Sequence, residues 1–116
     1  MMKVKEMLEK LNLQLLTKDV SEDALYAEVA GGYAGDLLSN VMGQAQPGMV
    51  WVTMQGHQNV AAVASLIGLA CVIVAGDGPV AEETLHKADM SDIVIAATKE
   101  PAFEVIGKLY ALQAEK

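Results

Sequence analysis

Three short apolar runs in the second half of the chain constrain its fold more than any other feature. They cover residues 49–54, 70–75 and 92–97. Each run is too short for a typical helix and too uniformly apolar to leave one face in water. Strands that are buried on both faces are typical of parallel sheets, which helices cover on both sides. We therefore expect an α/β fold with three layers, α/β/α, around a mostly parallel central sheet.

Apolar residues at helical spacing lie between and beside these runs, so strand and helix alternate from residue 49 onward. The expected helices are residues 4–11, 37–42, 60–67, 79–87 and a last one that begins at Pro101. The residues of the last helix expected to face the core are Phe103, Ile106, Leu109 and Tyr110. Asp36 and Asn59 are the expected N-caps of the second and third helices. Two further strands, Leu13–Leu16 and Tyr26–Ala30, and a loop at residues 18–24 complete the prediction.

The charge of the chain excludes several classes of function. Fifteen acidic residues oppose eight basic ones, all of them lysine, and the net charge is −7. Nucleic-acid binding and polybasic membrane binding both need clustered positive charge, which this chain lacks. A chain without arginine cannot clamp a carboxylate or phosphate with a guanidinium group. With 116 residues and no linker, repeat or low-complexity tract, we expect one acidic domain over residues 1–116.

Cysteine content and hydropathy favour a cytoplasmic protein. Cys71 is the single cysteine and lies in an apolar run, so we expect a buried side chain and no disulfide. The first residues, Met-Met-Lys-Val-Lys-Glu, lack the apolar segment of a signal peptide. Residues 37–76 carry no formal charge, but their longest apolar stretch, 60–75, would span only about 24 Å as a helix. We therefore expect no membrane span.

Candidate site residues lie mainly where the expected strands end, because ligands of open α/β sheets bind outside the carboxyl ends of the strands. His57 follows the first apolar run and is either an acid–base or anion-binding group or an ordinary loop residue. The segment 76–78 is either a backbone cradle for phosphate or a tight turn. The glycine-rich segment 31–36 is either an anion-binding nest or a turn. The candidate ligand-binding residues are Gly31, Gly32, Asp36, Gln55, His57, Gln58, Asn59, Gly76, Asp77 and Gly78.

No residue pattern predicts a metal site, a cofactor or a catalytic set. His57 and His86 are not at zinc-ligand spacing, and His86 is expected on an exposed helix surface. The glycines of residues 76–78 do not form a dinucleotide-binding or Walker A motif. Ser39 is not in a nucleophile elbow. We therefore predict no metal, no cofactor and no catalytic residues.

Several strings together resemble the DRTGG domain family. They are Gly31-Gly-Tyr-Ala-Gly-Asp-Leu-Leu-Ser-Asn-Val-Met42, Trp51-Val-Thr-Met54, Asn59-Val-Ala-Ala-Val-Ala-Ser65, and Ala102-Phe103 before a closing helix. The likeness covers residues 20–112 and is strongest to small stand-alone bacterial members. Other members are fused to CBS domains in regulated pyrophosphatases or to phosphotransacetylase, and a related fold forms the N-terminal domain of HPr kinase/phosphorylase. The resemblance implies an α/β/α domain that regulates or assembles, and it implies homodimers.

The chain departs from the residues that give this family its name. His57-Gln58 stands where the family has Asp-Arg, and Ala75-Gly76-Asp77 stands where it has Thr-Gly-Gly. Only Gly76 is retained, so the resemblance gives no support to an anionic ligand. Without an arginine, a neutral ligand or a protein partner fits this position better than a nucleotide.

Three hypotheses for function remain open at this point. The first is a non-catalytic regulatory or assembly module, a homodimer that senses a small ligand or docks a partner enzyme. The second is a small-molecule enzyme that uses His57 and Asp77 as acid and base. The third is a purely structural subunit. A small domain whose apolar strands leave an edge free also favours a homodimer.

Overall fold

The computed structural model describes residues 2–114, so residues 1, 115 and 116 of the expected domain lie outside the described part. A five-stranded sheet forms its centre, in the order β1-β5-β4-β3-β2, with β2 to β5 parallel and β1 antiparallel at one edge. The elements are α1 (Val4–Lys10), β1 (Gln14–Leu15), α2 (Glu22–Leu25), β2 (Gly32–Ala34), α3 (Leu38–Gln44), β3 (Val50–Thr53), α4 (Gln58–Ile67), β4 (Cys71–Val74), α5 (Glu82–Met90), β5 (Val94–Ala97) and α6 (Ala102–Ala114). The expected α/β fold with a mostly parallel sheet is confirmed.

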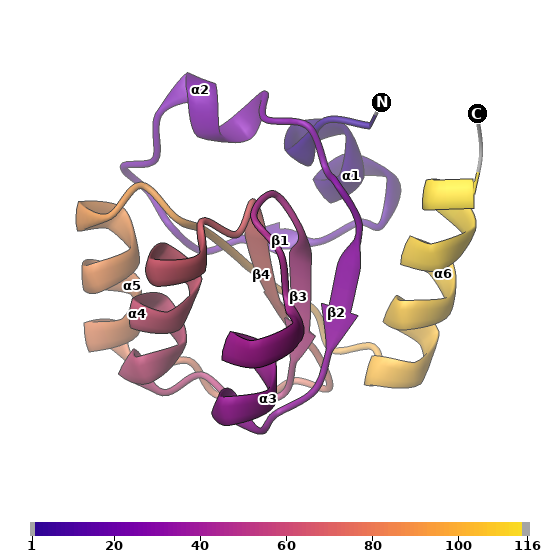
Figure 1. Ribbon diagram of the computed structural model, residues 1–116. Helices are drawn as coiled ribbons and strands as arrows, with labels where there is room; N and C mark the ends of the chain where they lie inside the picture. The colour runs from indigo at the N-terminus through magenta and orange to yellow at the C-terminus, as the bar shows by residue number, and fades with distance from the viewer. Residues whose placement is uncertain (1, 115–116) are drawn as a thin grey trace.

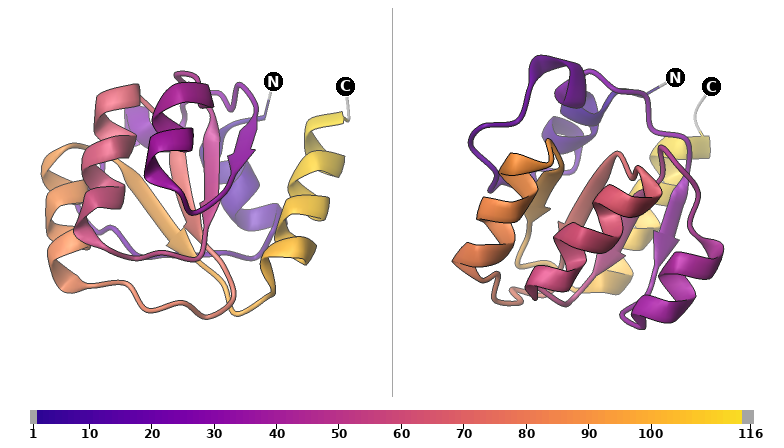
Figure 2. Two further views of the ribbon diagram at one scale, coloured as in Figure 1. Left: turned by 60° about the horizontal axis from the view of Figure 1, so that its bottom comes forward. Right: turned by 60° about the vertical axis from the view of Figure 1, so that its left-hand side comes forward.

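Helices cover both faces of this sheet, which gives the three layers (Figures 1 and 2). The parallel strands follow one another in sequence order, so every crossover moves in the same direction across the sheet. Because crossovers are right-handed, α3, α4 and α5 all lie on one face. The opposite face is covered by α1 and by α6, to which the chain returns after β5.

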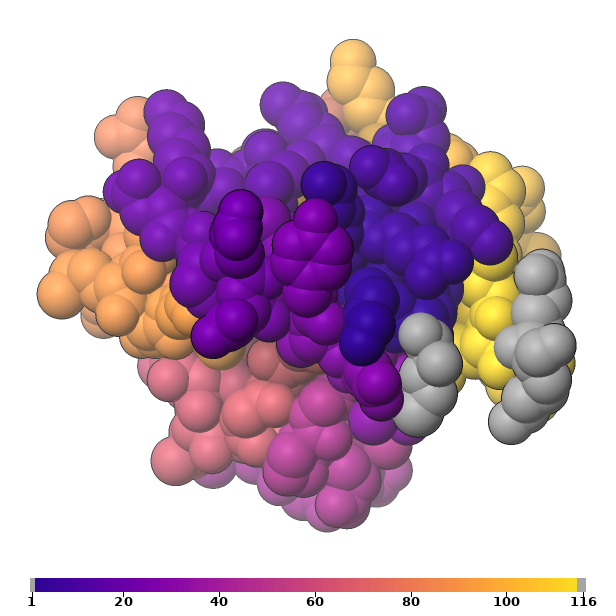
Figure 3. All heavy atoms as spheres, turned by 90° about the horizontal axis from the view of Figure 1, so that it is seen from above, coloured from indigo at the N-terminus to yellow at the C-terminus, as the bar shows by residue number. Residues whose placement is uncertain are grey.

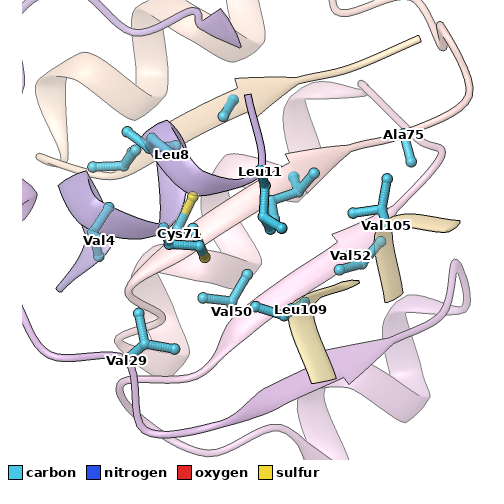
Figure 4. Close-up of a cluster of buried hydrophobic side chains, with 14 residues drawn as sticks. Val4, Leu8, Leu11, Val29, Val50, Val52, Cys71, Ala75, Val105 and Leu109 are labelled. Carbon is cyan, nitrogen blue, oxygen red and sulfur yellow. The ribbon is translucent and has the colours of Figure 1, made fainter. Parts of the chain in front are cut away.

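Alternate strand residues supply the two halves of the core. Val50, Val52 and Cys71 point toward α1 and α6, where they meet side chains such as Leu8 and Leu109 (Figure 4). Burial raises the pKa of the Cys71 thiol, as expected for a small buried apolar residue. The cluster on the other face is built around strand residues Trp51, Val72, Val74 and Ile95.

The N-terminal part of the chain crosses the amino-terminal ends of the parallel strands. Figure 3 looks down on this side of the molecule and shows the N-terminal part, in indigo and purple, over much of it. Ser21 fastens this part to the loop before β5, because its backbone N–H and its hydroxyl both donate to the Asp92 carboxylate at 2.6 Å. The backbone N–H of Asp19 donates to Asp89 at 2.9 Å.

Asp92 should make the stability of the protein depend on acid pH. The hydrogen bond from the Ser21 hydroxyl, and then the one from the Ser21 backbone, lower the pKa of this carboxyl in the folded state. The stabilisation is therefore complete above the unfolded pKa of about 4 and is lost as the pH falls through the lower folded value. Because the site is exposed, we expect less than about 1 kcal/mol. Urea unfolding at a series of pH values measures it.

The matched variant for this test is Asp92→Asn. Asp92 has a φ of 58°, and asparagine tolerates this left-handed conformation. Wild type and variant should differ most near neutral pH and converge once the pH has fallen below the lowered folded pKa of Asp92, where neither carries the charge. A constant difference across the whole pH range would contradict an ionic role for Asp92.

Several local predictions are wrong. The expected loop at residues 18–24 contains α2, which Ser21 caps by accepting a hydrogen bond from the Ala24 N–H at 3.1 Å. Residues 26–30 form no strand beyond one bridge between Lys3 and Glu28, because their alternation reflects only the burial of Val29 under α1. Helix α5 starts at Glu82 and not at Pro79, since the intervening residues pack as a loop on Gly56.

The expected inward face of α6 is wrong for three of its four residues. Leu109 is buried, but Phe103, Ile106 and Tyr110 are exposed, and Val105 is the second buried residue of the helix. The helix carries apolar residues almost all round, so periodicity cannot distinguish its two faces. None of the helices within residues 2–114 has the length and hydrophobicity needed to cross a bilayer.

Candidate functional site

The carboxyl ends of the parallel strands carry eight of the ten predicted site residues, as expected. Gly31 and Gly32 are the exceptions, because they lie at the amino end of β2, and so at the opposite end of the parallel strands. The predicted set therefore divides between two places in the molecule. The contacts of each group show what its residues do.

Asp36 and Gln55 join the loop after β2 to the loop after β3. The Asp36 carboxylate accepts hydrogen bonds from the Thr53 hydroxyl at 2.6 Å and from the Met54 N–H at 2.9 Å. The side-chain amide of Gln55 donates to the carbonyl oxygen of Asp36. Asp36 is thus not the N-cap of α3, a position that Leu37 takes, and its polar atoms serve the loop structure.

His57 caps α4, a position that the sequence assigned to Asn59. Its Nδ1 atom accepts a hydrogen bond from the Asn59 N–H at 3.1 Å, and Gln58 is the first helical residue. The imidazole is exposed. A histidine that accepts at the start of a helix satisfies one of the free N–H groups there. The observed contact of His57 is structural.

Gly76 and Asp77 form a tight turn and close the gap between β4 and β5. Their φ angles are 69° and 59°, and their N–H groups donate to Glu100 O at 2.7 Å and Thr98 O at 3.0 Å. Between these two strands the connections leave to opposite faces, toward α5 and α6, which is where α/β sheets form a ligand crevice. Here the two loops bond directly to one another, and these amides are occupied.

Gly78 allows two loops to pack backbone against backbone. A Cβ atom at Gly78 would lie 2.6 Å from Met54 O, and one at Gly56 would lie 2.0 Å from Pro79 O. The first turn of α5 begins at Glu82 and is acidic, which disfavours an anion at its start. Of the two alternatives for residues 76–78, the geometry therefore favours the turn over the phosphate cradle.

A groove of about 370 Å³ lies between β2 and α6. Gly32 and Ala34 have little or no side chain on this face, so α6 leaves a hollow beside them. No charged residue lines it. The lining residues are Gly31, Gly32, Tyr33, Ala34, Met49, Val52, Ile106, Leu109, Tyr110 and Gln113. A hollow of about 440 Å³ below α1 differs in that Lys5 and Glu9 are part of its lining.

The outer edge of β2 borders this groove and is unpaired in the described part of the chain. The Gly31 carbonyl accepts from Val50 N, and the Gly35 N–H donates to Val52 O, so both groups point toward β3. Backbone groups alternate in direction along a strand. Gly32 and Ala34 therefore direct their N–H and C=O groups outward, where another strand can pair with them.

The sequence predicted only some of the residues that line the groove. It named Gly31 and Gly32 but assigned Ile106 and Tyr110 to the core. The available signal was the composition of α6, which has too few polar residues for a helix with one exposed face. Within residues 2–114, no group of three or more His, Cys, Asp or Glu side chains is placed to hold a metal ion. No family model matches the chain, and no curated protein matches it.

Proposed function

We propose that this protein is a non-catalytic regulatory or assembly module that acts as a homodimer. The observation that carries the proposal is the uncharged groove between β2 and α6, which lies beside the unpaired edge of β2. Free strand edges and exposed apolar surface are features through which protein chains associate. A second copy of the chain is the occupant we propose for this side of the molecule.

The strand-end loops support the same proposal by contrast. The contacts of Asp36, Gln55 and His57 hold loops and a helix start, and the amides of Gly76 and Asp77 bond to the loop after β5. Of the two residues on which the enzyme hypothesis rests, His57 thus caps a helix through Nδ1, and Asp77 holds a turn through its backbone. Resemblance to the DRTGG family, with its regulatory and assembly-forming members, adds support. A cytoplasmic location is part of the proposal, because a single buried thiol suits a reducing compartment.

Light scattering during size-exclusion chromatography tests the homodimer. At micromolar concentration we expect a molar mass of twice the 12.3 kDa chain. His57→Ala and Asp77→Asn serve as controls and should leave that mass unchanged, since neither residue lines the groove. A monomer at these concentrations would contradict the proposal. Turnover in a broad substrate screen that His57→Ala abolishes would instead favour an enzyme.

A further inference from the structure

The outer face of α6 presents large apolar side chains to solvent. Only Glu104, Lys108 and Gln113 interrupt thirteen otherwise apolar residues. Phe103 and Tyr110 expose 83% and 77% of their surfaces. A helix that is apolar all round is normally covered all round. In Figure 1 and in the left view of Figure 2, α6 stands at the margin of the molecule, and no other element of residues 2–114 lies on its outer side.

We propose that two copies pair through this face, with their α6 helices antiparallel and a two-fold axis between Ile106 and Gly107. The inference rests on the proposed homodimer and names its interface. Phe103, Ile106, Gly107 and Tyr110 share one face of the helix at positions i, i+3, i+4 and i+7. This spacing is the same in both directions along the helix. An antiparallel copy therefore sets Phe103 against Tyr110 and Ile106 against Gly107, as an isologous interface requires.

Gly107 gives independent support for close helix packing. Glycine is unfavourable in the middle of a helix, and α6 continues for seven residues beyond it. A Cβ atom at this position would meet nothing within 4 Å in its own chain. No contact within the described residues therefore requires glycine here. The backbone of a second α6 would require it, because small residues let helices approach closely.

The charges on α6 favour an antiparallel over a parallel second copy. Glu104 precedes Lys108 by one turn, and Lys108 also contacts Glu100 at 2.6 Å, so the start of the helix is acidic and its middle is basic. Glu104 flanks the proposed face, and antiparallel pairing sets residue 104 opposite residue 109, so the two Glu104 carboxylates stay apart, whereas in-register parallel pairing would oppose them. The helix carries one acidic and one basic residue. It therefore offers an approach without net repulsion between two chains of charge −7.

The two exposed rings supply part of the area that a dimer needs. At roughly 200 Å² for an aromatic side chain, Phe103 and Tyr110 together present about 300 Å² on each copy. A stable interface buries about 800 Å² per partner. Ile106 and the walls of the groove beside α6 supply further apolar area next to the two rings.

Analytical ultracentrifugation of Gly107→Gln tests the interface. The side chain would occupy the space of the opposing helix, so we expect the dimer dissociation constant to rise at least tenfold. Folding should be retained, because glutamine is a better helix former and has open space in the monomer. The matched control is Gly43→Gln on α3, where a Cβ also meets nothing within 4 Å and where dimerisation should not change.

Cross-linking tests the orientation. Phe103→Cys and Tyr110→Cys chains carrying different tags are mixed and treated with a short bis-maleimide, and Cys71 is protected by its burial. We expect the mixed pair to cross-link more efficiently than Phe103→Cys chains alone. The reverse preference would overturn the antiparallel arrangement. A dimer that tolerates Gly107→Gln would overturn this interface but leave the homodimer standing, whereas a monomeric wild type would overturn both.

Discussion

Replacing Gly56 by alanine should lower the free energy of unfolding by about 3 kcal/mol. The added Cβ would lie 2.0 Å from Pro79 O and 2.6 Å from Val80 Cα, and both are backbone atoms. The loop cannot easily move away, because the Gly56 carbonyl accepts from the Thr84 hydroxyl at 2.6 Å and from Ala81 N at 3.2 Å. Urea unfolding followed by circular dichroism measures the change.

The control for this prediction is Gly43→Ala in α3. The same methyl group meets nothing within 4 Å there, and alanine is the better helix former. The free energy of unfolding should rise by up to about 1 kcal/mol. Equal losses in the two variants would show that Gly56 is not held by its neighbours. That outcome would also remove the structural explanation offered for Gly78.

The central sheet could be predicted from sequence because its strands are buried on both faces. Val50–Thr53, Cys71–Val74 and Val94–Ala97 all lie within the predicted apolar runs. The edge strands were harder to predict, because fewer of their side chains are buried and their sequences are less uniformly apolar. Gly32–Ala34 is short and exposed on alternate residues. Its position is set by backbone hydrogen bonds to β3, which do not depend on the side chains and so cannot be predicted from composition.

The site was predictable only in part, for two physical reasons. Polar residues at strand ends predict a ligand site only if their loops stand apart, and bonds such as Gly76 N to Glu100 O depend on the three-dimensional path of the loops. For α6, helical periodicity assumes that one face is polar. Phe103 and Tyr110 break that assumption, so the pattern could not assign the face that Val105 and Leu109 bury.

The unpaired edge of β2 and the exposed face of α6 border the same groove. The groove joins them, since Gly32 and Ala34 form one wall and Ile106 and Tyr110 form the other. A change that weakens the pairing of β2 with β3 should therefore also alter the groove. Trp51 of β3 allows a test, because its side chain bonds to the end of β2.

Trp51→Ala should lower the free energy of unfolding by about 3–5 kcal/mol, and Trp51→Phe by about 1–3 kcal/mol. The Trp51 side chain is fully buried between the sheet and its helices, and its Nε1–H donates to the Gly35 carbonyl at 2.7 Å. Phenylalanine keeps most of the packing but leaves that carbonyl without its partner, whereas alanine loses both. Chemical denaturation of the two variants separates these contributions.

Hydrogen exchange of the phenylalanine variant shows where the lost bond acts. Because the bond fixes the turn that ends β2, protection should fall most at the Gly35 amide, which donates to Val52 O, and least in β4. The amides of β4 are the internal control, since that strand is paired on both sides. A uniform loss across the sheet would mean that Trp51 acts only through packing. In the expected result, one indole N–H holds the end of the edge strand that borders the groove.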